Sequence, residues 1–334
     1  MQRAASLLHL FPLLTELGVD PREALEGSGV SAADIRPDSY IPYASYLQIL
    51  DRAAALSRCA DFGLRLGRLQ SLASLGPVGQ LMRHAATLGE ALTDFVTFQI
   101  SNSTGATVYL HASAGDFAFG YGVYDPNMRT SRHIYDLVVG VGCNLVRDLT
   151  GGKIEPLEIL MIGPAPADLA PYRALTSGPL RFEQSETSLI LPRRALQYPL
   201  DTADLAAREK ILPDLYQRLL QAPWGMSNRV RHALRSLMLT GVHSMREVAE
   251  HLDIHPRTLR RQLLAEGVTF EAIKDEVREA VARQLLSLTQ LPAADVGLSL
   301  GYSTPSSFIH AFERWSGLSP TRWRRQQRND RTDQ

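Results

Sequence analysis

The spacing of apolar residues divides the chain into helices followed by strands, and then into a final stretch of helices alone. In the first part, apolar residues recur every three or four positions, as they do on one face of a helix. The helices predicted there cover residues 7–17, 21–25, 43–56, 80–84 and 88–98. Short runs rich in β-branched and aromatic residues then predict strands at residues 107–110, 117–123, 157–162 and 189–191. Together these elements predict an α+β domain with a small antiparallel sheet.

The second predicted strand has two chemically different faces. Phe119 and Tyr121 alternate with Gly120 and Gly122 along the strand, and alternate residues point to opposite faces. Because glycine has no side chain, the glycine face allows a neighbouring element to approach closely. We expect the helix predicted over residues 132–149 to pack on that face.

The pattern indicates that this domain ends near residue 223. A helix predicted over residues 201–220 is followed by Pro223 and Gly225, residues that punctuate a chain between structural units. The 334 residues suffice for about two domains, each with its own core. We therefore predict an N-terminal domain (residues 1–223), an all-α C-terminal domain (226–328) and a disordered tail (329–334).

The C-terminal domain contains two copies of one pattern. Residues 248–254 recur 48 positions later as residues 296–302, and an apolar pair spaced by four residues follows in both copies. Such self-similarity indicates two copies of one small supersecondary unit. Each copy predicts a helix, a tight turn and a second helix.

The residues around each turn are typical of a helix-turn-helix unit. In the first copy, Ser244 and Glu247 can form a capping box, and Pro256 occupies the first position of the second helix. Ala249 and its counterpart Gly297 are small enough for two helices to cross closely. The second helix of such a unit fits the major groove of DNA, where base edges present a distinguishable pattern of donors and acceptors.

A long helix predicted over residues 269–288 links the two units. Its length of about 30 Å is close to the roughly 34 Å between successive major-groove faces of DNA. Arginines beyond the second unit are expected to contact the phosphate backbone. The residues predicted to contact DNA are His255, Arg257, Thr258, Arg260, Arg261, Gln262, Ser303, Thr304, Ser306, Ser307, His310, Arg314, Arg322 and Arg324.

The segment GLSLGYSTPSSFIHAFERWSGLSPTRWRR, which begins at Gly297, resembles the signature of the AraC/XylS family of bacterial transcription regulators. Residues 244–270 resemble the first helix-turn-helix of that family. The sequence departs from the family at His310 and Glu313, where basic residues are usual, and at Gly297, where alanine is usual. The resemblance implies a transcription regulator, more often an activator, that binds double-stranded promoter DNA and contacts RNA polymerase.

The strings FGLRLG (residues 62–67), LGPVG (75–79) and TLGEAL (87–92) resemble the N-terminal effector-binding and dimerisation domain in one branch of this family. This resemblance implies a small-molecule effector and a homodimer. Aromatic and polar residues near the predicted sheet are candidate effector contacts, although aromatic residues in such positions are more often core residues. These candidates are Phe98, Tyr109, Phe119, Tyr121, Arg129, His133 and Tyr135.

The distribution of charge supports a DNA-binding C-terminal domain. The 35 basic and 35 acidic residues give a net charge of zero, which at first sight argues against a nucleic-acid partner. However, residues 1–225 carry 19 basic and 23 acidic residues, whereas residues 226–334 carry 16 and 12. All but three of the basic residues are arginine, whose planar guanidinium suits bidentate contact with phosphate or guanine.

The composition excludes several other classes of protein. A hydrophobic content of 45% argues against intrinsic disorder, and two cysteines are too few for a disulfide scaffold. The longest apolar stretch, residues 135–146, is shorter than the roughly 20 residues that span a bilayer. We expect a cytoplasmic protein with reduced thiols and no membrane segment.

The sequence contains no motif that predicts catalysis. Gly140 and Gly142 lack the third glycine of a dinucleotide loop, and no P-loop, GxSxG or HExxH string occurs. His251 and His255 have the spacing of helical zinc ligands, but the predicted turn separates them. We therefore expect neither an enzyme nor a metal or other cofactor. The alternatives that remain are a helical protein-binding adaptor without DNA binding and, less favoured, an enzyme fused to a helical module.

Overall fold

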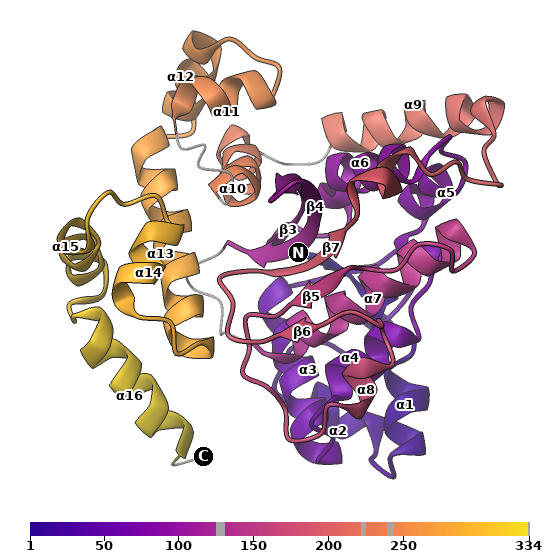
Figure 1. Ribbon diagram of the computed structural model, residues 1–334, viewed down its shortest axis with the longest axis horizontal. Coiled ribbons are helices and arrows are strands. Elements are labelled where there is room, and N and C mark those ends of the chain that lie inside the picture. The colour runs from indigo at the N-terminus through magenta and orange to yellow at the C-terminus, as the bar shows by residue number, and fades with distance from the viewer. Residues whose placement is uncertain (125–130, 222–224, 239–243, 333–334) are drawn as a thin grey trace.

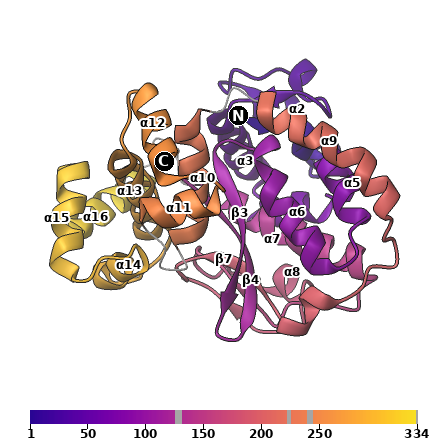
Figure 2. The ribbon, with the colours of Figure 1, turned by 90° about the horizontal axis from the view of Figure 1, so that it is seen from above.

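The structure is a computed structural model that describes residues 1–124, 131–221, 225–238 and 244–332 (Figure 1). The N-terminal two thirds and the C-terminal third form two bodies that lie side by side, as two perpendicular views show (Figures 1 and 2). Residues 222–224, which include the predicted domain boundary, lie outside the described residues. Among the described residues, no helix is both long and apolar enough to cross a membrane.

The N-terminal body combines helices with a small sheet, as predicted. Its α-helices (α) and 3-10 helices (η) are η1 (Ala4–Leu7), α1 (Leu10–Glu16), α2 (Pro21–Leu25), η2 (Ala32–Asp34), α3 (Tyr43–Ser57), α4 (Phe62–Arg68), η3 (Leu72–Leu75), α5 (Pro77–Arg83), α6 (Leu88–Phe98), η4 (Gln99–Ser101), α7 (His133–Thr150), α8 (Ala170–Arg173), η5 (Arg193–Gln197) and α9 (Leu205–Gln221). Its strands are β1 (Gln2–Arg3), β2 (Tyr40–Ile41), β3 (Ala106–Ser113), β4 (Asp116–Val123), β5 (Glu158–Leu160), β6 (Leu180–Arg181) and β7 (Thr187–Leu191).

The main sheet has five strands in the order β3-β4-β7-β5-β6. Its first three neighbouring pairs are antiparallel, whereas β5 and β6 are parallel. Tyr121 of β4 lies opposite Val108 on one side and Thr187 on the other. The sheet is therefore antiparallel except at one edge, where the short strand β6 was not predicted.

Helix α7 packs closely against α4 because two glycines of α4 allow the backbones of the two helices to approach. A Cβ atom on Gly63 would lie 2.1 Å from the carbonyl oxygen of His133, and one on Gly67 would lie 2.2 Å from that of Leu137. Both glycines belong to the string FGLRLG, and their spacing of four residues matches the spacing of the two carbonyls on α7. The string thus encodes a close crossing of two helices.

The prediction that α7 packs on the glycine face of β4 is wrong. A Cβ atom on Gly122 would lie 2.4 Å from Cζ of Arg235, which belongs to the C-terminal third, and one on Gly120 would meet the ring of Tyr109 at 2.4 Å. Helix α7 lies instead on the opposite, aromatic face, where a Cβ atom on Gly142 would stand 3.8 Å from the Phe119 ring. The large aromatic residues supply the apolar area that a long helix buries.

The C-terminal third is entirely helical within its described residues. Its helices are α10 (Met226–Leu237), α11 (Met245–His251), α12 (Pro256–Ala265), α13 (Phe270–Leu288), α14 (Ala293–Ser299), α15 (Pro305–Ser316) and α16 (Pro320–Thr332). Helix α13 connects the α11–α12 pair to the α14–α15 pair (Figure 1). Helix α16 runs through Thr332 and so extends into residues 329–334, for which the sequence predicts a disordered tail, and its Trp323 is buried.

We predict that Gly67→Ala destabilises the chain by about 1–3 kcal/mol or more, because the new methyl group must push α4 and α7 apart. Gly163→Ala is the matched control, since its Cβ atom would find only Arg132 Cγ, at 3.9 Å, and it should change stability by less than about 0.5 kcal/mol. Chemical denaturation of both variants measures the difference. Equal stability of the two variants would contradict the close crossing.

Candidate nucleic-acid interface and effector cavity

The two repeated units fold in the same way around their turns. Asp253 and Gly301 occupy equivalent positions, and both have left-handed backbone conformations, with φ of 52° and 77°. After the turn, the backbone N–H of Ile254 donates to the carbonyl of Ala249, and the N–H of Tyr302 donates to the carbonyl of Gly297, each at 3.0 Å. The sequence repeat therefore corresponds to two helix-turn-helix units.

The departure from the family at Gly297 has a steric explanation. A Cβ atom at this position would lie 2.8 Å from Cβ of Phe308, which is fully buried on α15. The equivalent position in the first unit is Ala249, and the residue that corresponds to Phe308 there is the smaller Leu259. The second unit has a smaller residue on α14 and a larger one on α15, so the close crossing is kept.

The start of each second helix is fixed by residues that were predicted to contact DNA. The N–H of Arg257 donates to Nδ1 of His255 at 3.2 Å, so His255 caps α12. In the second unit, the N–H of Ser307 donates to Oγ1 of Thr304 at 3.2 Å. These capping side chains are also exposed and lie at the helix end that enters the groove in such units.

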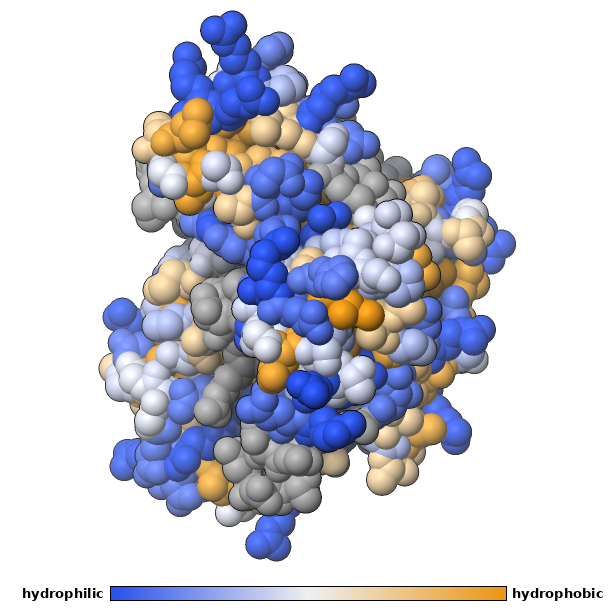
Figure 3. Space-filling view, turned by 90° about the vertical axis from the view of Figure 1, so that its left-hand side faces the viewer, coloured by the Kyte–Doolittle hydropathy of each residue, from blue (hydrophilic) through white to orange (hydrophobic). Residues whose placement is uncertain are grey.

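The outward face of α12 is strongly basic. The exposed residues Arg257, Arg260 and Arg261 follow one another around this face, with Gln262 exposed and Thr258 half-buried beside them. Toward the other described residues, the three guanidinium groups form no hydrogen bond or salt bridge. Figure 3 shows strongly hydrophilic residues projecting at the upper end of the molecule, where α11 and α12 lie in Figure 1. These donors are available to phosphate and base edges.

The outward face of α15 is polar and less basic. Ser303, Ser306 and His310 are exposed on or just before this helix. Arg314 is also exposed, but its Nη2 donates to Oδ2 of Asp275 at 2.8 Å. An arginine paired with a carboxylate has less charge to offer a phosphate, so the first unit carries the larger share of free positive charge.

Arg324, one of the four tail arginines (322, 324, 325 and 328) that are predicted to contact phosphate, has an internal structural role. Its Nε donates to the carbonyl of Leu286 at 3.1 Å and its Nη2 to that of Leu291 at 2.6 Å. These bonds satisfy carbonyls at and beyond the C-terminal end of α13, which the helix itself leaves without a donor. Arg322 is exposed on the opposite side of the same turn and keeps the position expected of a backbone contact.

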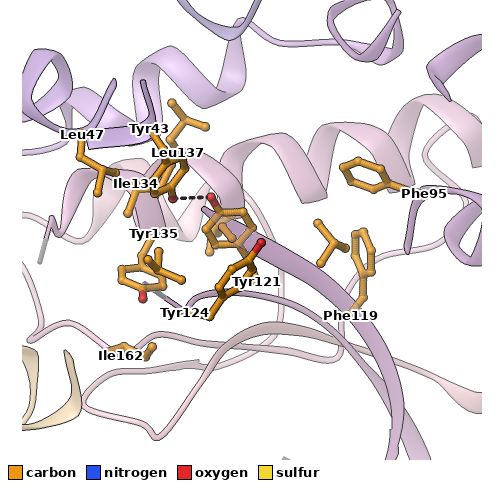
Figure 4. Close-up of a cluster of buried hydrophobic side chains, with 14 of the residues drawn as sticks. Tyr43, Leu47, Phe95, Phe119, Tyr121, Tyr124, Ile134, Tyr135, Leu137 and Ile162 are labelled. Atoms are coloured by element: carbon orange, nitrogen blue, oxygen red, sulfur yellow. Dashed lines mark hydrogen bonds between the residues drawn. The ribbon is translucent and has the colours of Figure 1, made fainter. Parts of the chain in front are cut away.

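The N-terminal domain contains a cavity between the aromatic face of the sheet and α7. The cavity volume is about 110 Å³, counted as space open to the centre of a water molecule. Phe119 and Tyr121 of β4 line it, together with Phe95 of α6 and Leu137 of α7. Figure 4 shows these four side chains in one cluster of buried residues, where the hydroxyl groups of Tyr43 and Tyr121 form a hydrogen bond of 2.7 Å.

Two of the seven candidate effector contacts, Phe119 and Tyr121, line this cavity. Phe98 packs on Tyr216 outside it, and Tyr109 lies on the opposite face of the sheet with its hydroxyl donating to Glu186. His133 lies beside the crossing with α4 and is not part of the lining. Tyr135 donates to Gln284 of the C-terminal third at 2.7 Å, and Arg129 lies outside the described residues.

The polar residues of the cavity were missed at the level of sequence. Gln70, Gln99 and Asn102 line its polar end and are nearly inaccessible to solvent. They follow the ends of α4 and α6, where polar residues are usual and give no sign of a binding site. Only the fold brings these segments together.

Polar contacts join the two domains across the glycine face of β4. Arg235 of α10 is fully buried and donates from Nε to the carbonyl of Val123 at 3.1 Å. Nε2 of His232, one turn earlier, lies 3.0 Å from Oγ1 of Thr107 on β3. Burial of the imidazole lowers the pKa of His232 from 6.5 to about 4, with a further contribution from His251.

Comparison with known proteins identifies the family. The family described as the arabinose-binding domain of AraC transcription regulators matches residues 18–200, and a helix-turn-helix domain family matches residues 248–326. The chain belongs to the AraC/XylS family of transcription regulators. It is a DNA-binding transcription regulator, and the α+β domain followed by paired helix-turn-helix units is the arrangement of this family.

Relatives in the family align with this chain along most of their length. The HTH-type transcriptional regulator VirS of Mycobacterium tuberculosis is 30% identical over 326 residues, which cover 96% of each chain. The ornithine utilization regulator of Pseudomonas aeruginosa is 27% identical over 331 residues, which cover 94% of each chain. The crystal structure of the regulator CdpR from Pseudomonas aeruginosa matches 79% of this chain and 86% of its own, with 27% identity and a TM-score of 0.40.

Among the described residues, no group of three or more histidine, cysteine, aspartate or glutamate side chains could hold a metal ion. Cys59 and Cys143 are both buried and unpaired. His251 ends α11 and His255 caps α12, so the two histidines lie on different elements.

We predict that Arg260→Ala weakens binding of promoter DNA by about 1–3 kcal/mol and relaxes the discrimination between operator and altered sequence at one position. The chain should keep its stability, because the Arg260 side chain is exposed. Arg65→Ala is the control: Arg65 is exposed in the N-terminal domain and paired with Asp61. Fluorescence anisotropy with operator and scrambled duplexes measures both effects. An equal loss of affinity in the two variants would contradict base contact by α12.

A second prediction concerns pH. The unfolded chain takes up a proton at His232 near pH 6.5, whereas the folded chain resists it until about pH 4, so stability falls as the pH decreases through this window. His232→Gln keeps a side chain that can bond Thr107 but does not titrate, and it should show a smaller fall. Thermal unfolding midpoints of both proteins across the window measure the difference. Parallel curves would show that His232 is not held neutral.

Proposed function

We propose that this regulator is a one-component sensor: a small molecule binds the N-terminal domain and changes how the two helix-turn-helix units engage promoter DNA. The observation that carries the DNA half of this proposal is the set of three exposed arginines on α12. We assign DNA contact to the predicted residues of the two second helices and to Arg322, with Arg324 acting on the fold. Residues 1–223 form the sensor and residues 226–328 the reader.

The cavity offers a physical route from effector to reader. Tyr121 lines the cavity, and the next residue, Gly122, packs on Arg235 of α10. The carbonyl that accepts from Arg235 belongs to Val123, two residues from the cavity lining. A ligand that displaces Tyr121 therefore acts two residues from the contact that holds the reader. A ligand with different affinity for the docked and released arrangements shifts the population between them.

The family supports the remaining parts of the proposal. Regulators of this family commonly act as homodimers, activate transcription and contact RNA polymerase in the cytoplasm, and we extend these properties to this chain. The relatives are named as transcription regulators, which favours this function over a helical adaptor and over an enzyme.

The proposal predicts a steep salt dependence of DNA affinity. Each phosphate contact releases counterions and adds about −0.9 to the slope of log affinity against log salt. Three α12 arginines should therefore contribute a slope of about −2.7, to which other contacts add. The measurement is binding of the full chain to promoter DNA between about 50 and 200 mM salt.

The triple variant Arg257→Ala, Arg260→Ala and Arg261→Ala should lose that share of the slope. A flat salt dependence of the wild-type chain would overturn the DNA half of the proposal and favour the protein-binding adaptor.

A further inference from the structure

The lining of the cavity carries almost no charge. Of the described lining residues, Arg3 alone is charged at neutral pH. Its guanidinium is already engaged, since Nη2 lies 2.9 Å from Oδ1 of Asp38 and Nη1 donates to the carbonyl of Ser74 at 3.4 Å. A charged ligand that enters the cavity loses its hydration and finds no free charge of opposite sign there. This desolvation costs free energy, and the cost is smaller for a neutral ligand.

Three amide side chains at one end of the cavity have hydrogen-bonding atoms without partners. Oε1 of Gln70, Oε1 of Gln99 and Nδ2 of Asn102 are buried and form no hydrogen bond with the described residues. The side chains are 4%, 3% and 8% exposed. Buried polar atoms without partners are rare in folded proteins because each loses its bond with water. Here four residues that carry such atoms, the three amides and Ser188, belong to the lining of one cavity.

The three amides form one polar end. The N–H of Asn102 donates to the carbonyl of Gln99 at 2.7 Å, and the carbonyl of Asn102 accepts from the N–H of Arg3 at 2.8 Å. Nε2 of Gln70 donates to the carbonyl of Ser6, three residues further along the same N-terminal segment, at 3.0 Å. Hydrogen bonds therefore tie the segments that carry the amides to the N-terminal segment, whose Arg3 and Ser6 also line the cavity.

The lining that α6, α7 and the sheet contribute is mostly apolar, with Tyr121, Thr187 and Ser188 as its polar residues. Phe95 and Phe119 lie with ring centroids 6.2 Å apart, and α7 contributes Leu137, Val141 and Leu145 along its length. The cavity of about 110 Å³ has room for a small organic molecule. Such a space suits a short aliphatic or aromatic body.

We propose that the cavity binds a small uncharged amphipathic molecule, with a head group that both donates and accepts hydrogen bonds. The head group bonds the side-chain amides of Gln70, Gln99 and Asn102, and the apolar body lies between the sheet and α7. This inference rests on the proposed function, in which the N-terminal domain is the sensor.

Three probes of equal chain length test the inference on the full chain: octanamide, octanoate and octylammonium. They differ in head-group charge, and octanamide has the donors and acceptors that the amides require. Calorimetric titration should give an affinity for octanamide about tenfold or more above that for either ion, because each ion loses hydration without a free counter-charge. Equal or tighter binding of octanoate or octylammonium would overturn the inference, as would no binding of octanamide.

A matched pair of variants locates the site. Gln99→Leu removes an acceptor that has no protein partner, so the thermal midpoint should stay constant or rise while octanamide affinity falls several-fold. Gln217→Leu makes the same change at an exposed position on α9 and should leave octanamide affinity unchanged. Unchanged octanamide affinity in Gln99→Leu would contradict the assignment of the polar end.

The outcome is separable from that of the proposed function. A chain that binds promoter DNA with a steep salt dependence but does not bind octanamide would keep the regulator function and lose the ligand class. A chain that binds octanamide but whose affinity for DNA does not depend on salt would keep the ligand class and lose the DNA-binding part of the proposed function.

Discussion

The packing of Arg235 on the glycine face of β4 joins the two domains, and the position of the DNA-binding units depends on it. The side chain is fully buried, and its guanidinium occupies the space that a Cβ atom on Gly122 would need. Any larger residue at position 122 would separate α10 from the sheet. Hydrogen bonds from Thr107 and Tyr135 to the C-terminal third flank this contact and resist its rotation.

This contact is costly compared with the packing inside the sensor. Nη1 and Nη2 of Arg235 have no hydrogen-bond partner among the described residues, and burial of a charge costs several kcal/mol unless it is compensated. The crossing of α4 and α7, in contrast, buries apolar side chains and closely packed backbone. A ligand of modest affinity can therefore shift the docking of the domains while the core that holds the cavity stays intact.

The DNA-binding units could be predicted from the sequence because their signals are local. The capping box of Ser244, the repeat of small and apolar residues, and the turn positions Asp253 and Gly301 all act within a few residues of one another. The face of β4 was assigned to the wrong helix for the opposite reason. A glycine shows that something approaches closely, but the approaching residue, Arg235, lies more than a hundred positions away in the sequence.

The candidate effector contacts show the same difference between local signals and contacts of distant segments, here for single side chains. Aromatic residues near the sheet were reasonable candidates, yet most of them fill space: Phe98 packs on Tyr216 and Tyr109 covers Gly120. Hydrophobic periodicity identifies which side chains are buried, but it does not show where burial leaves a gap. In our proposal the effector occupies that gap, and the groups that recognise it are buried amides, each of which has one polar atom without a hydrogen-bond partner. Such groups can be found only when segments distant in the sequence are placed together. The sequence therefore predicts individual residues of the DNA-binding domain, but it predicts the sensor only as a domain.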